Sequence, residues 1–261
     1  MAAPLIALDN IGKSFDGGRA FALRGINLGF EAGSFTALVG QSGSGKTTTL
    51  KTINRLVEPD EGQVRIDGHS ALAEPGPRLR RRIGYVFQSI GLFPHLTVAE
   101  NIAAGPRLAG WSRERIATRI DELLDLVALP RALSSRAPAE LSGGQQQRVG
   151  LARALAAEPK IMLMDEPFGA LDPITRIDLG DTYRALHGKL GLTTVMVTHD
   201  VQEAVLLADR IVVMKSGRVI ADGAPRALMA GHPDPDVSAL MATPRIQAER
   251  VAALTRSAPG E

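Results

Sequence analysis

Residues 35–50 read "FTALVGQSGSGKTTTL", and the topology of the chain can be worked out from this segment. Its first five residues suit a buried strand, and after the glycine-rich part apolar residues recur at helical spacing, at Leu50, Ile53 and Val57. A phosphate-binding loop needs this order of strand, loop and helix, because its backbone N–H groups must converge on one anion. Residues 40–47 match G-x-x-x-x-G-K-[ST] at every fixed position, so a chance glycine-rich turn is the weaker interpretation.

The composition is that of an ordinary α/β protein. The chain has 261 residues, of which 44% are hydrophobic, 22% charged and 4% aromatic, enough to bury a substantial core. It contains no cysteine, which excludes disulfides and thiolate metal sites. The net charge of +2 is small and both signs are spread along the chain, so it gives no argument for a nucleic-acid partner.

The densest basic run is "RLRRR" at 78–82. It could be a nucleic-acid-binding patch. Because it directly precedes the strand-like "IGYVF", we favour the interpretation that these charges are solvated at the start of a strand. We therefore predict no nucleic-acid partner.

No membrane span is indicated by the sequence. No apolar run approaches the ~20 residues that cross a bilayer, and "MAAPLIALDN" lacks the basic start and long apolar centre of a signal peptide. We expect a cytoplasmic protein that meets a membrane only through a partner.

The remaining patterns divide the chain. Residues 90–149 are mostly helical in pattern, clearest in "SRERIATRIDELLDLVAL", for which Ser112 is a plausible N-cap. Strand-like segments then resume at 160–167, 193–200 and 210–223, the last as a hairpin. We predict an α/β fold with a mostly parallel sheet in a core of residues 1–89 and 150–231, an inserted helical lobe at 90–149 and a peripheral tail at 232–261.

Two carboxylates follow the strand-like "IMLM" at 161–164. Asp165 is placed to hold Mg²⁺ near the Thr47 hydroxyl, while Lys46 would neutralise phosphate charge. Glu166 is placed to act as the base that orients an attacking water; the alternative, that it only caps the strand, would leave hydrolysis without a base.

His199 and Gln88 each follow a predicted strand. His199 comes after "TTVMVT", at the strand end where open α/β sheets collect their ligand chemistry, and we interpret it as a γ-phosphate sensor. Gln88 follows "IGYVF" at the start of the helical lobe and is either a reporter of the γ-phosphate and metal or a solvated glutamine. The other histidines, at 69, 95, 187 and 232, are interpreted as surface or packing residues.

A second candidate phosphate site occurs at 141–150, "LSGGQQQRVG", whose serine and paired glycines suit a turn with N–H groups facing one anion. Two phosphate cradles in one chain need an explanation.

Together these motifs resemble the ATP-binding subunits of ABC transporters over essentially the whole chain. The P-loop at 40–47, Gln88, the signature "LSGGQ" at 141–145, the Walker B segment at 161–166, the D-loop "ALD" at 170–172 and the switch His199 occur in the family's order. The resemblance implies a P-loop NTPase core with an N-terminal antiparallel β subdomain, and ATP and Mg²⁺ as cofactors.

The resemblance also implies which residues carry these roles. Phe15 would stack on adenine, at a position more often tyrosine. The implied nucleotide-binding residues are Phe15, Gly40, Gln41, Ser42, Gly43, Ser44, Gly45, Lys46, Thr47, Thr48, Ser142, Gly143, Gly144, Gln145 and Asp172. The implied metal site comprises Thr47, Gln88 and Asp165, and the catalytic set comprises Glu166, His199 and Gln88.

In this family two copies associate head to tail, with each nucleotide between the P-loop of one and the signature of the other. Ser142, Gly143 and Gly144 would then bind the γ-phosphate held by a second copy. This resolves the question of two cradles, since one chain carries halves of two sites.

Further stretches of the sequence narrow the resemblance to one class of ABC transporter. The stretch "IGLFPHLTVAENI" at 90–102 carries Leu92, Phe93 and Leu96, which we expect to be exposed, and in importers this surface receives a coupling helix. "SIGLFPH" and "PFGALDPITR" look like ATPases that drive uptake of quaternary-ammonium osmoprotectants such as glycine betaine, choline or carnitine. Many of these carry C-terminal CBS modules, which we do not expect after Gly231.

The partners implied are a second copy, permease subunits contacting residues 88–102 and an extracytoplasmic solute-binding protein, with the chain peripheral at the cytoplasmic face of the membrane. The alternatives are a motor of another importer or of an exporter, and a non-transport ABC ATPase acting on DNA or the ribosome. The last class usually carries a long coiled coil or a second ATPase domain, and neither pattern occurs in this sequence.

Overall fold

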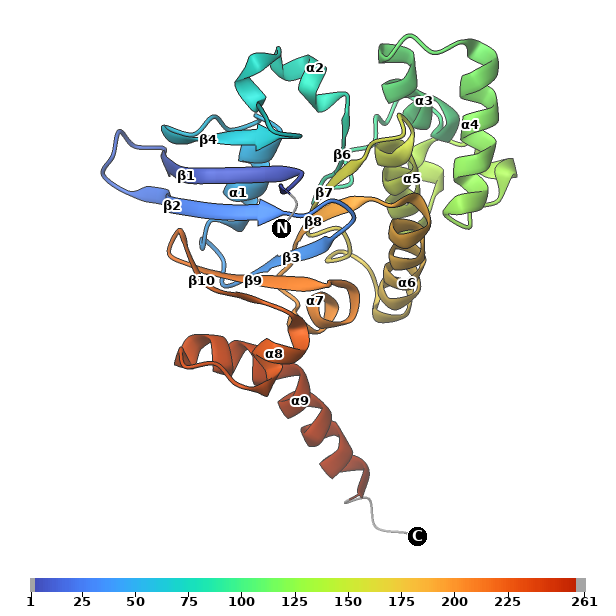
Figure 1. The fold of residues 1–261 in the computed structure, drawn as a ribbon. Coiled ribbons are helices and arrows are strands. Elements are labelled where there is room, and N and C mark those ends of the chain that lie inside the picture. Colours follow the sequence, from blue (N-terminus) through green and yellow to red (C-terminus); the bar gives the residue numbers. More distant parts are fainter. Residues whose placement is uncertain (1–2, 257–261) are drawn as a thin grey trace.

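The computed structural model describes residues 3–256, and the larger of its two sheets carries the P-loop (Figure 1). This six-stranded sheet has the order β10-β9-β3-β8-β7-β6, parallel except for the antiparallel pair β9–β10. Its strands are β3 (Phe35–Val39), β6 (Ile83–Val86), β7 (Ile161–Asp165), β8 (Thr193–Val197), β9 (Arg210–Lys215) and β10 (Arg218–Gly223). Every residue of β3, β7 and β8 is buried, as expected for parallel strands covered on both faces.

The second sheet is antiparallel, with the order β2-β1-β4-β5. Its strands are β1 (Ile6–Ser14), β2 (Phe21–Phe30), β4 (Glu61–Ile66) and β5 (His69–Ser70). Buried side chains of this sheet, such as Leu8 and Ile26, share one apolar cluster with Leu50 and with Leu163 of β7. The two sheets therefore hold the P-loop helix between them, and the predicted fold class is confirmed.

The helices flank the larger sheet and form a lobe beside it (Figure 1). They are α1 (Lys46–Ile53), α2 (Gly76–Arg80), α3 (Val98–Leu108), α4 (Arg113–Leu126), α5 (Gly143–Leu155), α6 (Pro173–Leu190), α7 (Val201–Leu207), α8 (Pro225–Ala230) and α9 (Pro235–Arg256). Short 3-10 turns occupy Ala71–Ala73, Arg131–Leu133 and Pro138–Glu140. No helix within residues 3–256 combines the length and the hydropathy that a bilayer crossing requires.

Two predicted helices can be compared with the structure. α4 begins after Ser112, whose hydroxyl accepts the Arg115 N–H, so the predicted N-cap is confirmed. α1 ends at Ile53, earlier than the apolar spacing predicted, and Val57 lies beyond it. Arg55 adopts a left-handed φ of 56°, which turns the chain out of the helix.

The helical lobe of Figure 1 contains α3, α4 and the start of α5. The predicted boundary at 149–150 falls inside α5, which continues to Leu155 beside the larger sheet. The division into lobes therefore stays a prediction.

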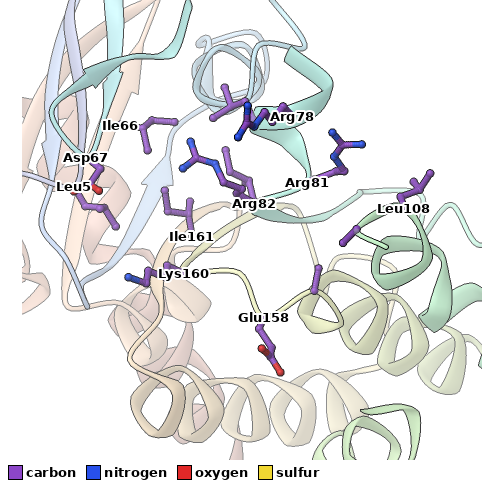
Figure 2. Close-up of a pocket in the computed structure, with 14 residues that line it drawn as sticks. Leu5, Ile66, Asp67, Arg78, Arg81, Arg82, Leu108, Glu158, Lys160 and Ile161 are labelled. Atoms are coloured by element: carbon purple, nitrogen blue, oxygen red, sulfur yellow. The ribbon is translucent and has the colours of Figure 1, made fainter. Parts of the chain in front are cut away.

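The basic run at 78–82 lies partly on α2 and partly in the turn directly before β6, where the sequence interpretation put the start of a strand. Figure 2 shows Arg78, Arg81, Arg82 and Lys160 around a cavity of about 620 Å³. Arg82 forms an ion pair with Glu74. The cavity lies where β6 and β7 begin, so it is at the opposite edge of the sheet from the P-loop.

The C-terminal segment differs from the expected peripheral tail. Val237 and Met241 in the first half of α9 are completely or almost completely buried in the main core cluster. Asp236 pairs with Lys215 at the end of β9. The expectation was therefore wrong for this half, because α9 covers apolar surface that would otherwise be exposed; residues 257–261 of the predicted tail lie outside the described residues.

We predict that Met241→Ala destabilises the protein by about 2–5 kcal/mol, because it leaves a cavity in a packed core. The free energy of unfolding in urea measures this. Leu254→Ala, at a side chain of the same helix that is 75% exposed, serves as the matched control and is expected to change stability by less than about 0.5 kcal/mol. Equal effects of the two variants would contradict the assignment of α9 to the core.

Candidate functional site

The P-loop follows β3 and wraps back on itself through glycines in left-handed conformations. Gly40 has a φ of 145°, and a Cβ there would overlap the carbonyl oxygen of Met214. Gly45 has a φ of 101°, and its Cβ would lie 2.6 Å from the carbonyl oxygen of Ala22. Side chains are excluded at both positions, so the sequence pattern has a direct steric cause.

Lys46 begins α1 and is buried against this loop. Its Nζ donates to the carbonyl oxygens of Gly40 at 2.8 Å and Gln41 at 2.9 Å. Burial lowers the pKa of Lys46, while the nearby Glu166 and Asp165 act in the opposite direction. The P-loop therefore holds a positive charge close to two carboxylates.

Thr47 and Asp165 join the P-loop helix to the end of β7. The Thr47 hydroxyl donates to Asp165 Oδ1 at 2.8 Å, and Asp165 is only 4% exposed. Tyr85, on the neighbouring β6, donates its hydroxyl to the other carboxylate oxygen at 3.5 Å. Burial, followed by the charge of Asp165, raises the pKa of Tyr85, which keeps this hydroxyl a donor.

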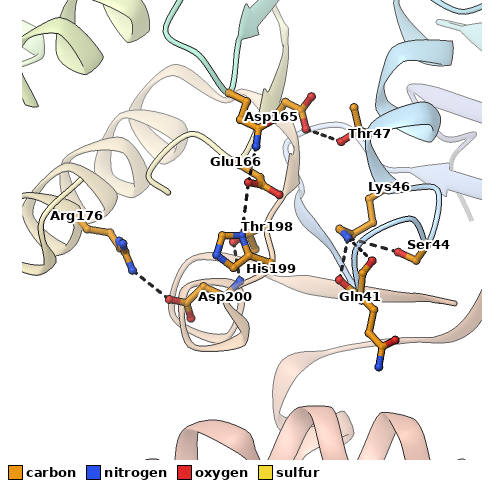
Figure 3. A network of polar contacts seen from close by, with 12 residues as sticks. Gln41, Ser44, Lys46, Thr47, Asp165, Glu166, Arg176, Thr198, His199 and Asp200 are labelled. Atoms are coloured by element: carbon orange, nitrogen blue, oxygen red, sulfur yellow. Dashed lines mark hydrogen bonds and ion pairs between the residues drawn. The ribbon is translucent and has the colours of Figure 1, made fainter. Parts of the chain in front are cut away.

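Glu166 is held by two side chains that the sequence analysis selected. Gln88 Nε2 donates to Glu166 Oε2 at 2.9 Å. His199 Nδ1 lies 3.5 Å from the same oxygen, and Figure 3 shows the His199 ring facing Glu166. The Glu166 backbone has a left-handed φ of 48° and donates its N–H to Val197 of β8 at 2.9 Å. Such a conformation is uncommon for a non-glycine residue and is often found at functional sites.

These groups surround a hollow of about 600 Å³. Its lining consists of Ala22, residues 42–48, Gln88, Glu166 and His199. It thus brings together most of the predicted P-loop, metal and catalytic positions. Among the described residues, neither the signature nor Asp172 contributes to this lining.

Phe15 and Gln41, two further predicted nucleotide-binding residues, lie outside the hollow, as does Gly40. Phe15 is 67% exposed at the start of the loop between β1 and β2, with Lys13 Nζ 5.5 Å from its ring centre. Gln41 lines a different cavity, of about 380 Å³, between the P-loop and α9. The role of both residues stays a prediction.

The signature forms the start of α5. Ser142 caps this helix by accepting the Gln145 N–H at 3.3 Å, and the Gln145 side chain accepts the Ser142 N–H at 3.0 Å. Ser142 and Gly143 are exposed. This turn is the start of a thirteen-residue helix, whose partial positive charge favours an anion.

The D-loop lies beside the signature. A Cβ at Gly144 would lie 2.7 Å from Thr175 in the first turn of α6. Asp172 caps α6 by accepting the Thr175 N–H at 3.0 Å. The signature and the D-loop therefore occupy one region of the surface, apart from the hollow at the P-loop.

The segment after Gln88 is fastened to α5. Arg153 donates to the carbonyl oxygens of Ile90 at 2.8 Å and Gly91 at 2.6 Å. Of the three apolar residues expected to be exposed, Phe93 is 44% exposed, but Leu92 and Leu96 are half-buried, so that expectation was wrong for two of them. Leu92 packs on the main core, which explains its burial.

Sequence reasoning missed Tyr85 and Arg153, because their roles depend on neighbours far along the chain. It was correct about His187, which is buried and contacts Thr194 and the Gly33 carbonyl as a packing residue.

Comparison with known proteins agrees with this geometry. Residues 23–169 match the family model described as "ABC transporter". The chain belongs to the ABC transporter family. It therefore carries an ABC ATPase domain, which binds ATP, and the family predicted from the motifs is confirmed.

The chain is similar to bacterial transport ATP-binding proteins and to an ATP-binding cassette of solved structure. It is 53% identical over 225 residues to the glycine betaine uptake system ATP-binding protein YehX of Escherichia coli (strain K12), covering 86% of this chain and 72% of the relative. It is 46% identical over 242 residues to the choline transport ATP-binding protein OpuBA of Bacillus subtilis (strain 168), covering 93% of this chain but only 63% of the relative. The dimeric post-hydrolysis structure of the ATP-binding cassette MJ0796 bound to ADP and Pi has a TM-score of 0.76 and 36% identity, covering 84% of this chain and 98% of that chain.

A half-buried carboxyl group, that of Glu203, lies close to His199. Burial raises the pKa of Glu203, in α7, from 4.5 to about 7, although a hydrogen bond with Thr198 opposes this. Between these pH values the native state keeps a proton that the unfolded state has lost, so the native state loses stability as the pH rises through this window.

We predict that Glu203→Gln raises the melting temperature more at pH 8 than at pH 5, because the amide keeps its place without needing a proton. Each kcal/mol gained corresponds to roughly 2–4 °C for a protein of this size. Thermal unfolding of both proteins at the two pH values measures the difference. A difference that does not change with pH would contradict the assignment.

Proposed function

We propose that the chain is the ATP-hydrolysing motor subunit of an ABC importer for quaternary-ammonium osmoprotectants such as glycine betaine or choline. The observation that carries the hydrolytic part is the convergence of Gln88 and His199 on one oxygen of Glu166, beside the P-loop. The importer class and solute rest on the relatives.

The geometry suits hydrolysis of a γ-phosphate. Glu166 would accept a proton from the attacking water while the water oxygen forms a bond to the γ-phosphorus. The bond between the γ-phosphorus and ADP would break, and its electron pair would leave with ADP. Gln88 orients the Glu166 carboxylate through its amide N–H. Lys46, held by the loop carbonyls, would offset charge on the phosphates.

The residues present fit Mg²⁺. Thr47 Oγ1 and Asp165 Oδ1 are hard oxygen donors 2.8 Å apart, and a magnesium site in such enzymes takes one or two protein oxygens together with substrate phosphates. Thr47 and Asp165 would hold the ion, with Gln88 at the edge of the set. When bound, the ion neutralises phosphate charge.

A second copy would complete the site. The exposed Ser142 and Gly143 at the start of α5, with Gly144 and Gln145, offer N–H groups and a helix N-terminus to a γ-phosphate held by another chain. Asp172 lies in the same region. The dimeric structure of MJ0796 supports association of two copies. We expect the two copies of this chain to meet head to tail, with ATP joining them and loss of the hydrolysis products releasing them.

Permease subunits would contact residues 88–102. Phe87 and Phe93, 43% and 44% exposed, are large apolar side chains on either side of a segment that Arg153 holds in place. Through these subunits the chain would be held at the cytoplasmic face of the membrane, and an extracytoplasmic binding protein would select the solute. Motors of another importer or of an exporter share the same site chemistry and are the second candidates.

Glu166→Gln is expected to keep ATP binding but to lower turnover by roughly 10² to 10⁴-fold, because it removes the base. Steady-state phosphate release and binding of a fluorescent ATP analogue measure the two properties. Glu122→Gln, at an exposed carboxylate of α4, is the control and should hydrolyse at the wild-type rate. Unchanged turnover in Glu166→Gln would contradict the assignment of Glu166 as the general base.

Uptake in cells tests the solute class. The test uses a strain that lacks other osmoprotectant uptake systems, grown at high osmolarity. We expect cells with the native gene to accumulate labelled glycine betaine or choline, and cells with the Glu166→Gln form to accumulate neither. Accumulation of neither solute by the wild type, together with intact ATP hydrolysis, would overturn the solute assignment and leave the motor assignment standing.

A further inference from the structure

His199 has little to hold its ring in place. Its side chain is 64% exposed, and its ring faces Glu166 Oε2, 3.5 Å from Nδ1. An exposed ring that must meet a phosphate depends on its backbone for position, so the residues on either side of His199 matter.

Asp200 fixes that backbone. Its Oδ1 accepts the N–H groups of Gln202 at 2.9 Å and Glu203 at 3.2 Å, which caps α7. Its own N–H donates to the Thr198 hydroxyl at 3.0 Å. His199 therefore lies inside a tight turn whose shape is set by the Asp200 carboxylate.

The second oxygen of this carboxylate faces α6. Arg176 Nη1 lies 3.4 Å from Asp200 Oδ2, and Figure 3 marks this ion pair with a dashed line. Arg176 Nη2 donates to the carbonyl oxygen of Leu171 at 3.1 Å. Leu171 immediately precedes the D-loop aspartate, Asp172. A single guanidinium thus connects the turn of His199 to the backbone of the D-loop, and its planar fork fixes both acceptors at once.

This arrangement costs stability. Arg176 Nε is buried and has no hydrogen-bond partner among the described residues. A buried donor left unsatisfied is unfavourable, a cost that Arg55 and Arg119 also carry. The same two parts of the chain are already joined elsewhere, because Arg184 of α6 pairs with Asp209 beyond α7 at 2.6 Å.

We propose that Arg176 is a positioning residue for hydrolysis, which links the D-loop to the switch histidine by bridging Leu171 and Asp200. The inference rests on the proposed function. It gives a route by which a second copy, on reaching Asp172, changes the position of His199 in the first copy. Arg176 does not line the hollow at the P-loop, so it acts through His199 and not on the nucleotide.

The test uses the purified full chain with Arg176→Met, Arg176→Lys and the matched control Arg184→Met. We expect Arg176→Met to lower kcat about 10-fold with the KM for ATP within about twofold of wild type, since misplacement of a catalytic group reduces rate and not binding. Arg176→Lys keeps a charge near Asp200 and should be intermediate. Arg184→Met should match the wild type. The stoichiometry of nucleotide binding corrects kcat for any inactive fraction.

A second measurement separates positioning from general damage. In a His199→Ala background, with turnover followed as labelled phosphate, Arg176→Met should cause no further loss. An equal loss of about 10-fold with His199 and with His199→Ala would overturn the inference, and so would equal turnover in Arg176→Met and Arg184→Met. In either case, hydrolysis by the wild type would leave the proposed function intact. If Arg176→Met does not fold, wild-type kcat in Arg176→Lys overturns the inference. Absence of hydrolysis by the wild type would overturn both.

Discussion

The site depends on four neighbouring parallel strands that end at one edge of the larger sheet. In the order β3-β8-β7-β6, each strand is followed by a group of the site: the P-loop, His199, the Asp165–Glu166 pair and Gln88. The hydrogen bond from Thr47 to Asp165 joins two of these ends directly at 2.8 Å. Because all four strands are hydrogen-bonded and three are fully buried, their ends are fixed relative to one another, which is the preorganisation that hydrolysis requires.

Around this edge of the sheet, three local features lower the stability of the fold. Glu166 adopts a left-handed backbone, and the Arg176 guanidinium keeps one buried nitrogen unsatisfied. The half-buried Glu203 carboxyl is destabilising once ionised. All three lie next to His199 or the D-loop, at the ends of strands that are themselves fully buried. The stability supplied by the core therefore offsets strain at the proposed site of hydrolysis.

Two surfaces of the chain are assigned to other molecules. The signature and the D-loop lie together at the starts of α5 and α6, and the segment around Phe93 is held by Arg153 on another part of α5. A single helix thus contacts both the region proposed for the second copy and that proposed for the permease. A rigid helix between two contact regions is a physical means of coupling hydrolysis to movement of a membrane partner.

Local sequence patterns were enough to predict the fold class, the P-loop and the choice of Lys46, Asp165, Glu166 and His199 as site residues, because strand, loop and helix signals each span a few residues. Contacts between motifs could not be predicted in this way. Tyr85 on Asp165, Arg153 on Ile90 and Arg176 on Asp200 each join positions at least 24 residues apart, and nothing local in the sequence marks them. Burial of Met241 and Leu92 likewise depended on which surfaces remained to be covered after the sheet had formed. These pairings follow from strand order and helix packing, which composition and periodicity do not specify, so they became visible only in the folded chain.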